Sequence, residues 1–149
     1  MAFLDRLPTK GRLNRMGLVN DLHCTLCGVG FETRNHLFFE CPIATALWSA
    51  IFDINGIRFR HTSWETLYNW AIATWKRKSL LTSLMKISSN ALIYTIWKER
   101  NKRIFQGQAS TIDVMFKAIK ETVGFHLRGR PINRFDTVNI NLCNQWGII

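Results

Sequence analysis

Residues 24–41, CTLCGVGFETRNHLFFEC, carry four metal-binding side chains within eighteen consecutive residues. Cys24, Cys27, His36 and Cys41 follow the spacing C-x2-C-x8-H-x4-C. Three thiolates and one imidazole are the number and kind of ligands that a tetrahedral structural Zn2+ takes, and they leave no position open for water or substrate. The stretch therefore predicts a CCHC zinc knuckle whose metal stabilises the fold and does not react.

The residues around the ligands favour this geometry. Gly28 and Gly30 can adopt the positive φ angles that a tight turn after Cys27 needs. Pro42 suits the first turn of a helix, and residues 37–39, LFF, supply an apolar cushion beside the metal. A structural zinc contributes on the order of 10 kcal/mol to folding, which is enough to order a segment too small for a core of its own.

Disulfides and a different histidine ligand are the alternatives at this stretch. Cys143, the fourth cysteine, lies more than a hundred residues beyond Cys41, and the N-terminus lacks the apolar segment of a secretory signal. His23, beside Cys24, could replace a ligand but would break the compact loop geometry. We expect zinc, and an intracellular protein, nuclear or cytoplasmic, in a reducing compartment.

Length and composition indicate one folded domain. The 149 residues are 47% hydrophobic and 12% aromatic, which is enough for a core, and no apolar run is long enough to span a membrane. The net charge of +10 is uneven, with seven basic against six acidic residues in 1–75 and thirteen against four in 76–149. Such asymmetry favours a polyanionic partner, of which nucleic acid is the commonest in cells, although solubility explains part of it.

Apolar residues at helical spacing predict most of the secondary structure. The expected helices lie within residues 7–22, 42–54, 63–76, 79–106 and 110–128. The fold class is therefore mainly α: a small helical bundle with an N-terminal CCHC zinc knuckle and an irregular or extended C-terminal tail. Its parts within a single domain, 1–149, are the knuckle at 24–41, the helical body at 42–128 and the tail at 129–149.

Several residues receive specific expectations. Tyr94 and Phe105 fall on the broad apolar face of the 79–106 helix, whereas Ser88 and Glu99 fall opposite it. Residues predicted to cap helices are Thr9, Ser63 and Ser110. Trp64 and Trp70 are predicted to lie in the core, and His61 is predicted to lie at the surface.

Basic residues at the end of the 79–106 helix are the first candidates for phosphate contacts. The candidates are Lys98, Arg100, Lys102 and Arg103, followed by Lys10, Arg12 and Arg15 in the 7–22 helix. Either group could equally be a solvated basic face, since helix exteriors are usually charged and cations suit a helix C-terminus.

Five pieces of the sequence together resemble the zinc-binding domain that follows reverse transcriptase in plant non-LTR (LINE-type) retrotransposons. They are LPTKGRLNRMGL (7–18), CTLCG (24–28), ETRNHLFFECPIATALW (32–48), IWKERNKRIFQG (96–107) and, more loosely, LCNQWGI (142–148). The resemblance implies a nucleic-acid-binding appendage to the polymerase. Cys24, Cys27, His36 and Cys41 fall on the family's metal positions. The resemblance does not extend to reverse transcription, because no polymerase or ribonuclease H carboxylates are present.

The sequence predicts a binding module without catalytic residues. Its acidic residues are spread singly, and it lacks a phosphate-binding glycine loop, a G-x-S-x-G elbow and an H-E-x-x-H helix. The leading hypothesis is a retrotransposon-type, zinc-dependent binder of RNA or DNA without sequence specificity. The alternative is a zinc-stapled helical module for protein interaction or oligomerisation, docking on a reverse transcriptase or on another copy of itself. Neither hypothesis involves a membrane.

Overall fold

Helices form the regular structure in residues 2–133 and 135–148, which the computed structural model describes. The elements are η1 Ala2–Arg6 (a 3-10 helix), α1 Lys10–Arg15, η2 His36–Glu40 (a π-helix), α2 Pro42–Ile54, α3 Trp64–Thr74, α4 Leu80–Gln106, α5 Ile112–Leu127 and α6 Thr137–Trp146. Extended pairing within these described residues is limited to one antiparallel bridge between His23 and Phe31. The mainly α fold with a Cys and His cluster near the N-terminus is confirmed.

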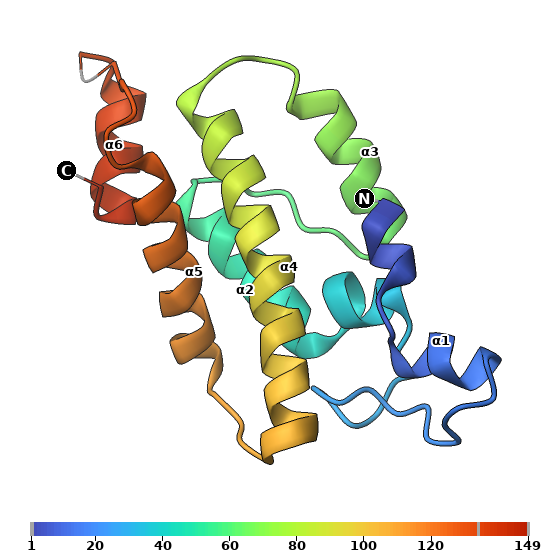
Figure 1. Cartoon of the computed structure of the whole chain (residues 1–149). Helices are drawn as coiled ribbons and strands as arrows, with labels where there is room; N and C mark the ends of the chain where they lie inside the picture. The colour runs from blue at the N-terminus through green and yellow to red at the C-terminus, as the bar shows by residue number, and fades with distance from the viewer. Residues whose placement is uncertain (1, 134, 149) are drawn as a thin grey trace.

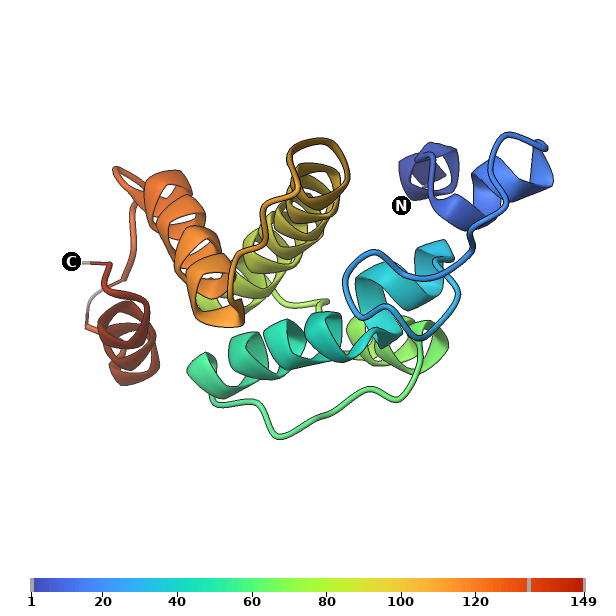
Figure 2. The ribbon, with the colours of Figure 1, turned by 90° about the horizontal axis from the view of Figure 1, so that it is seen from below.

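Helix α4 is the central element of the fold. Its 27 residues extend about 40 Å, from the Ser79 cap, whose hydroxyl accepts the N–H of Thr82, to Gly107 at φ 64°. Helix α5 packs along one side of α4, α2 crosses behind it, and the knuckle lies beside its C-terminal half (Figures 1 and 2). None of the helices among the described residues is long and apolar enough to cross a membrane.

The core centres on helix α2. Its predicted apolar face is fully buried and comprises Ala44, Leu47, Trp48, Ile51 and Phe52. Trp64 and Trp70 pack against this core as expected. His61, which was expected at the surface, is half-buried: its ring lies edge-on to Trp48 and Phe52, and its Nε2 lies 2.6 Å from the carbonyl oxygen of Phe39. This burial lowers the pKa of His61.

Two of the three predicted helix caps agree with the structure and one is shifted. The hydroxyls of Thr9 and Ser63 accept the N–H groups of Arg12 and Thr66, as capping predicts. The expected cap Ser110 is wrong by one residue, because Thr111 caps α5. The reason is that the backbone N–H of Ser110 donates to a carboxylate oxygen of Glu99, so Ser110 is already held by α4.

The C-terminal segment corrects the expectation of an irregular or extended tail. Residues Thr137–Trp146 form α6, capped by Asp136, whose carboxylate accepts the N–H groups of Val138 and Asn139. The buried residues of α6 are Leu142, Cys143 and Trp146, and the Trp146 indole donates to Asn55 Oδ1 at 2.8 Å. Val138, Ile140 and Leu142 alternate along the chain and suggested a strand, but burial follows the helical spacing of 142, 143 and 146.

The predicted faces of α4 also need correction. Tyr94 and Phe105 are exposed, whereas Ser88 and Glu99 are buried. Ser88 is tolerated in the core because its hydroxyl donates to the carbonyl of Leu84 at 2.5 Å. Other elements pack against α4 on several sides, so the buried surface of α4 extends beyond a single apolar face.

Candidate metal centre

The first half of the knuckle is a tight turn closed by backbone hydrogen bonds. The N–H of Cys24 donates to the carbonyl of Gly30 at 2.7 Å, and the N–H of Gly28 donates to the carbonyl of Cys24 at 2.8 Å. Gly28 has φ 73°, so the chain reverses directly after Cys27 in a conformation that favours glycine. Both sulfurs of the C-x2-C pair are thereby held on the same side of the turn.

The second half uses a π-turn that the sequence pattern did not reveal. The N–H of Cys41 donates to the carbonyl of His36 at 2.6 Å, an i to i+5 bond. In an α-helix, residues five apart would point about 140° away from each other, because each residue turns about 100°. The wider π-turn brings them closer to one face, and such bulges often mark functional sites. Cys41 also precedes Pro42, the first residue of α2.

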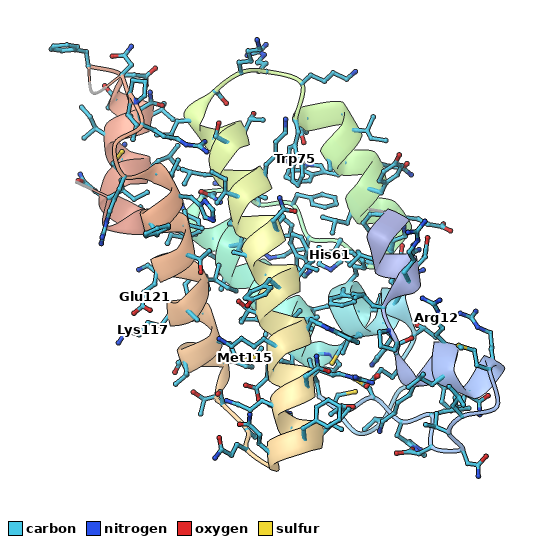
Figure 3. The ribbon with its side chains drawn as sticks, viewed as in Figure 1. Arg12, His61, Trp75, Met115, Lys117 and Glu121 are labelled. Atoms are coloured by element: carbon cyan, nitrogen blue, oxygen red, sulfur yellow. The ribbon has the colours of Figure 1, made fainter. Side chains whose placement is uncertain are left out.

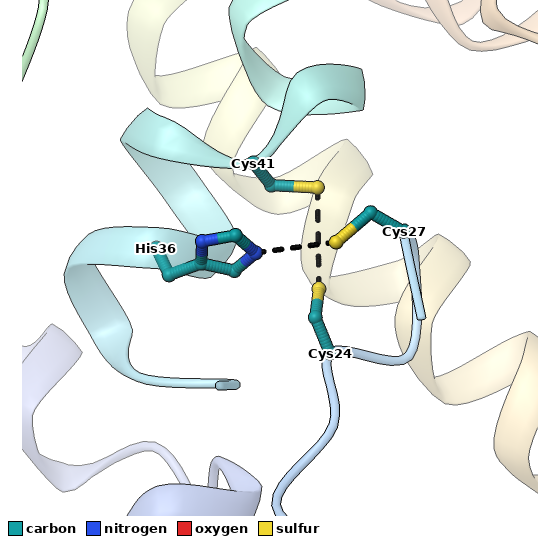
Figure 4. A group of neighbouring side chains, drawn as sticks. All are labelled: Cys24, Cys27, His36 and Cys41. Carbon is teal, nitrogen blue, oxygen red and sulfur yellow. Dashed lines mark hydrogen bonds between the residues drawn. The ribbon is translucent and has the colours of Figure 1, made fainter. Parts of the chain in front are cut away.

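The four side chains converge from these two segments (Figure 4). Cys24 Sγ lies 3.9 Å from Cys41 Sγ, Cys27 Sγ lies 3.3 Å from His36 Nε2, and all four ligand atoms lie within 4.8 Å of one another. Tetrahedral zinc with its usual bond lengths would separate two sulfurs by about 3.8 Å and a sulfur from a nitrogen by about 3.6 Å. The donor set and its spacing therefore fit a structural Zn2+.

The environments of the two buried sulfurs differ, and that of Cys41 favours a thiolate. The hydrogen bond from Cys24 lowers the pKa of Cys41, and the backbone N–H groups of Ile43 and Ala44 at the start of α2 lower it further. The pKa of Cys24 is raised because its thiol donates to Cys41 and because it is buried. Metal binding needs deprotonated cysteines, so the N–H groups at the start of α2 assist at Cys41.

Gly30 makes room for the histidine ligand. It does not need the positive φ that was expected. Instead, a Cβ atom at this position would lie 2.5 Å from Cε1 and 2.9 Å from Nε2 of His36. Only a residue without a side chain fits beside the imidazole.

Replacing Gly30 with alanine is expected to weaken zinc binding by about 10- to 100-fold, the usual effect of disturbing the surroundings of a metal ligand. The methyl group would push the His36 ring out of position. Competition with a chromogenic chelator measures the affinity. The control is Gly124→Ala in α5, where the added Cβ meets nothing within 4 Å. Equal zinc affinity of the two variants would contradict this role of Gly30.

A buried ion pair connects the knuckle to α4 and corrects one predicted phosphate contact. Arg100 donates to Glu32 Oε1 from Nη2 at 2.8 Å and from Nε at 3.1 Å, and the two side chains are 5% and 0% exposed. The guanidinium also lies 4.7 Å from the centre of the Trp97 ring. Glu32 further accepts the N–H groups of Lys10 and Thr25. Arg100 is therefore a structural residue that cannot reach a phosphate.

A second acidic residue, Glu99, engages two of the other three cations predicted at the end of α4. Glu99 forms ion pairs with Arg103 at 2.8 Å, four residues along the helix, and with Lys102 at 3.1 Å. Arg103 also donates to the carbonyl of Leu26 in the knuckle. Burial would raise the pKa of Glu99, but the bonds from Arg103, the N–H of Ser110 and Lys102 lower it to about 2. Arg103 therefore holds α4 to the knuckle, whereas Lys102 bonds to Glu99 and Ser110.

Of the remaining candidates, Lys98 and Arg15 are exposed, whereas Lys10 and Arg12 are half-buried. Lys10 forms an ion pair with Asp21 at 2.8 Å. Arg12, which is labelled in Figure 3, and Arg15 line a cavity of about 340 Å3 formed by N-terminal residues. The alternative ligand His23 is exposed and bonds to Asp21, so it is not part of the cluster.

Comparison with known proteins supports the same cofactor. Residues 1–48 match the sequence model of a protein family described as zinc-binding in reverse transcriptase. The match contains all four clustered side chains, so the resemblance to that family is confirmed over this segment, and zinc is confirmed as the cofactor that the cluster fits. Searches of curated proteins and of solved structures found no match.

Proposed function

We propose that the zinc-binding segment of reverse-transcriptase type, together with its basic helical body, makes this protein a non-catalytic module that binds RNA or DNA without sequence specificity. The zinc stabilises the fold and the positive charge binds phosphates. Such charge-driven binding is insensitive to base sequence because every nucleotide carries the same phosphate.

The observation that supports this proposal is the free positive charge of the C-terminal half. Among its thirteen basic residues, Arg100, Lys102 and Arg103 form ion pairs. The cations below form no ion pair with any residue that the structure describes. They are Lys76, Arg77, Lys78, Lys86, Lys98, Lys117, Lys120, Arg128 and Arg130. A surface with this much unneutralised charge attracts polyanions.

Titration of labelled RNA and DNA strands at several salt concentrations tests the proposal. For about five phosphate contacts on a single strand, affinity should fall about 100-fold between about 50 and 200 mM salt. Strands of different sequence should bind alike. Failure of the folded, zinc-loaded protein to bind either nucleic acid at low salt would reject the proposal.

A second candidate is protein interaction or self-association, which an apolar groove between α3 and α4 favours. The groove has a volume of about 440 Å3 and is lined by Trp64, Tyr68, Ile72 and Trp75. The indole N–H of Trp75, which is labelled in Figure 3, finds no acceptor among the described residues. Uncovered apolar surface of this kind often marks an interface. Light scattering discriminates, because a salt-independent dimer without affinity for nucleic acid would favour this candidate.

A further inference from the structure

We infer that a single strand of nucleic acid lays its phosphodiester backbone in a basic groove at the end of α4 remote from the zinc cluster. The inference rests on the proposed function and gives it a location. Residues of the α3–α4 turn, the first turns of α4 and the α5–α6 linker line the groove. These three segments can be followed in Figure 1. The charged residues that line the groove are Lys76, Arg77, Lys78, Lys86, Arg130 and Asp136.

The fold brings these cations together from separate segments. The three consecutive residues of the α3–α4 turn, KRK, meet Lys86 of α4 and Arg130 of the linker around a cavity of about 710 Å3. Five basic side chains face one carboxylate, that of Asp136. The carboxylate already accepts two N–H groups as the cap of α6. The groove therefore keeps most of its positive charge.

The groove cations are free, unlike most of the cations near the knuckle. All five are exposed, and their side chains form no ion pair or hydrogen bond within residues 2–133 and 135–148. Arg100, Lys102 and Arg103, by contrast, have carboxylate partners. Lysines and arginines without internal partners can exchange counterions for phosphates, which is the source of affinity in charge-driven binding.

The shape and chemistry of the groove favour a nucleic-acid strand over a membrane. A concave basic groove tracks a flexible phosphate backbone, whereas a helix that binds a bilayer surface buries an apolar face in the headgroup region. Ser83 and Asn133 add neutral hydrogen-bonding groups to the lining. Phe135, which is 98% exposed, directly precedes Asp136 and offers a ring on which a base can stack. A single strand presents phosphates and unstacked bases, which a basic groove beside a free aromatic ring can bind together.

Two variants with equal loss of charge test the location. The groove variant combines Lys76→Gln, Lys78→Gln, Lys86→Gln and Arg130→Gln. The control combines Arg6→Gln, Arg58→Gln, Lys117→Gln and Lys120→Gln, cations outside the groove that form no ion pair within the described chain. Zinc content and circular dichroism establish that both variants are folded. Fluorescence anisotropy with a labelled single strand of RNA, and with the same strand as DNA, gives the affinities.

Affinity of the groove variant is expected to fall at least about 30-fold and its salt slope by about 3, since four contacts are lost. The control should lose less than about fivefold through its weaker long-range field. Bound strands should also protect Lys76, Lys78 and Lys86 from acetylation more than Lys117 and Lys120.

Other results of these measurements would overturn either the location of the groove or the proposed function itself. Equal losses in the two variants, or equal protection of all the lysines, would overturn the groove while leaving the proposed function intact. Absence of binding by the folded wild type would overturn both. Binding to vesicles of anionic phospholipid, lost in the groove variant and unaccompanied by binding to nucleic acid, would reassign the groove to a membrane surface.

Discussion

Replacing Cys41 with serine is expected to abolish stoichiometric zinc and to unfold the N-terminal part of the protein. Cys41 is fully buried, its Sγ lies 3.9 Å from that of Cys24, and it joins η2 to α2. Apparent binding energies of structural zinc are about 10 to 16 kcal/mol. A whole domain is stable by only about 5 to 15 kcal/mol, so removing the metal removes an amount comparable with the entire stability. Elemental analysis and thermal unfolding followed by circular dichroism measure both effects.

Cys143→Ser is the matched control for this experiment. Cys143 is also a buried cysteine, but it lies in α6 and outside the metal cluster. It should keep one zinc per chain and lose only the few kcal/mol typical of a polar change in a core. An unchanged zinc content and melting temperature of Cys41→Ser would show that the cluster is not a metal site.

Replacing Arg100 with methionine is expected to destabilise the protein by about 3 to 5 kcal/mol, because the change leaves the Glu32 carboxylate buried without its cation. Glu32 is fully buried, and burial alone would raise its pKa. Bonds from Thr25, Lys10 and Arg100 reverse this, so the pKa of Glu32 is lowered. Urea denaturation of the zinc-loaded proteins measures the difference.

Lys98→Met on the exposed side of the same helix is the control, with an expected change within about 0.5 kcal/mol. Because the pKa of Glu32 is lowered in the folded wild type, its ionised carboxylate stabilises the fold at pH values above its ordinary pKa of 4.5. This stabilisation is lost as the pH falls below that value. In Arg100→Met, protonation of Glu32 instead relieves an unpaired buried charge. The gap between wild type and Arg100→Met should therefore narrow below about pH 4.5. Equal stability of the Lys98 and Arg100 variants at neutral pH would contradict the structural role of the pair.

Local patterns in the sequence predict where most helices begin, but they do not predict which distant segments pack against each helix. Pro42, Ser63 and Ser79 mark helix starts because proline geometry and capping are decided within a few residues. Helix α6 was not predicted, because its alternating apolar residues indicated an extended segment. The residue that anchors it, Trp146, donates a hydrogen bond to Asn55, 91 positions away. Interactions between distant segments decide such elements, and spacing along the chain does not show them.

The same distinction applies to the site. The metal-binding side chains could be found because they occupy eighteen consecutive residues and metals constrain ligand type. Arg100 could not be distinguished from Lys98, since its partner Glu32 is 68 positions away and both belong to an ordinary charged helix. The sign of this ion pair in the sequence was the acidic residue Glu32 inside the knuckle, because a carboxylate near buried ligands needs a cation as its partner. The groove cations carried a weaker signal, the run at residues 76–78.

The position of Trp48 within α2 has a consequence for work with fragments. Trp48 is the last residue of the stretch shared with the family, yet it lies in the middle of α2 and donates to the carbonyl of Phe38 at 2.8 Å. A peptide excised at this boundary would retain every ligand sulfur and the imidazole while uncovering Leu37, Phe38 and Phe39, which the rest of the molecule shields completely. The segment that matches the family is thus shorter than the segment that buries these side chains, and an isolated knuckle is expected to aggregate even when saturated with metal.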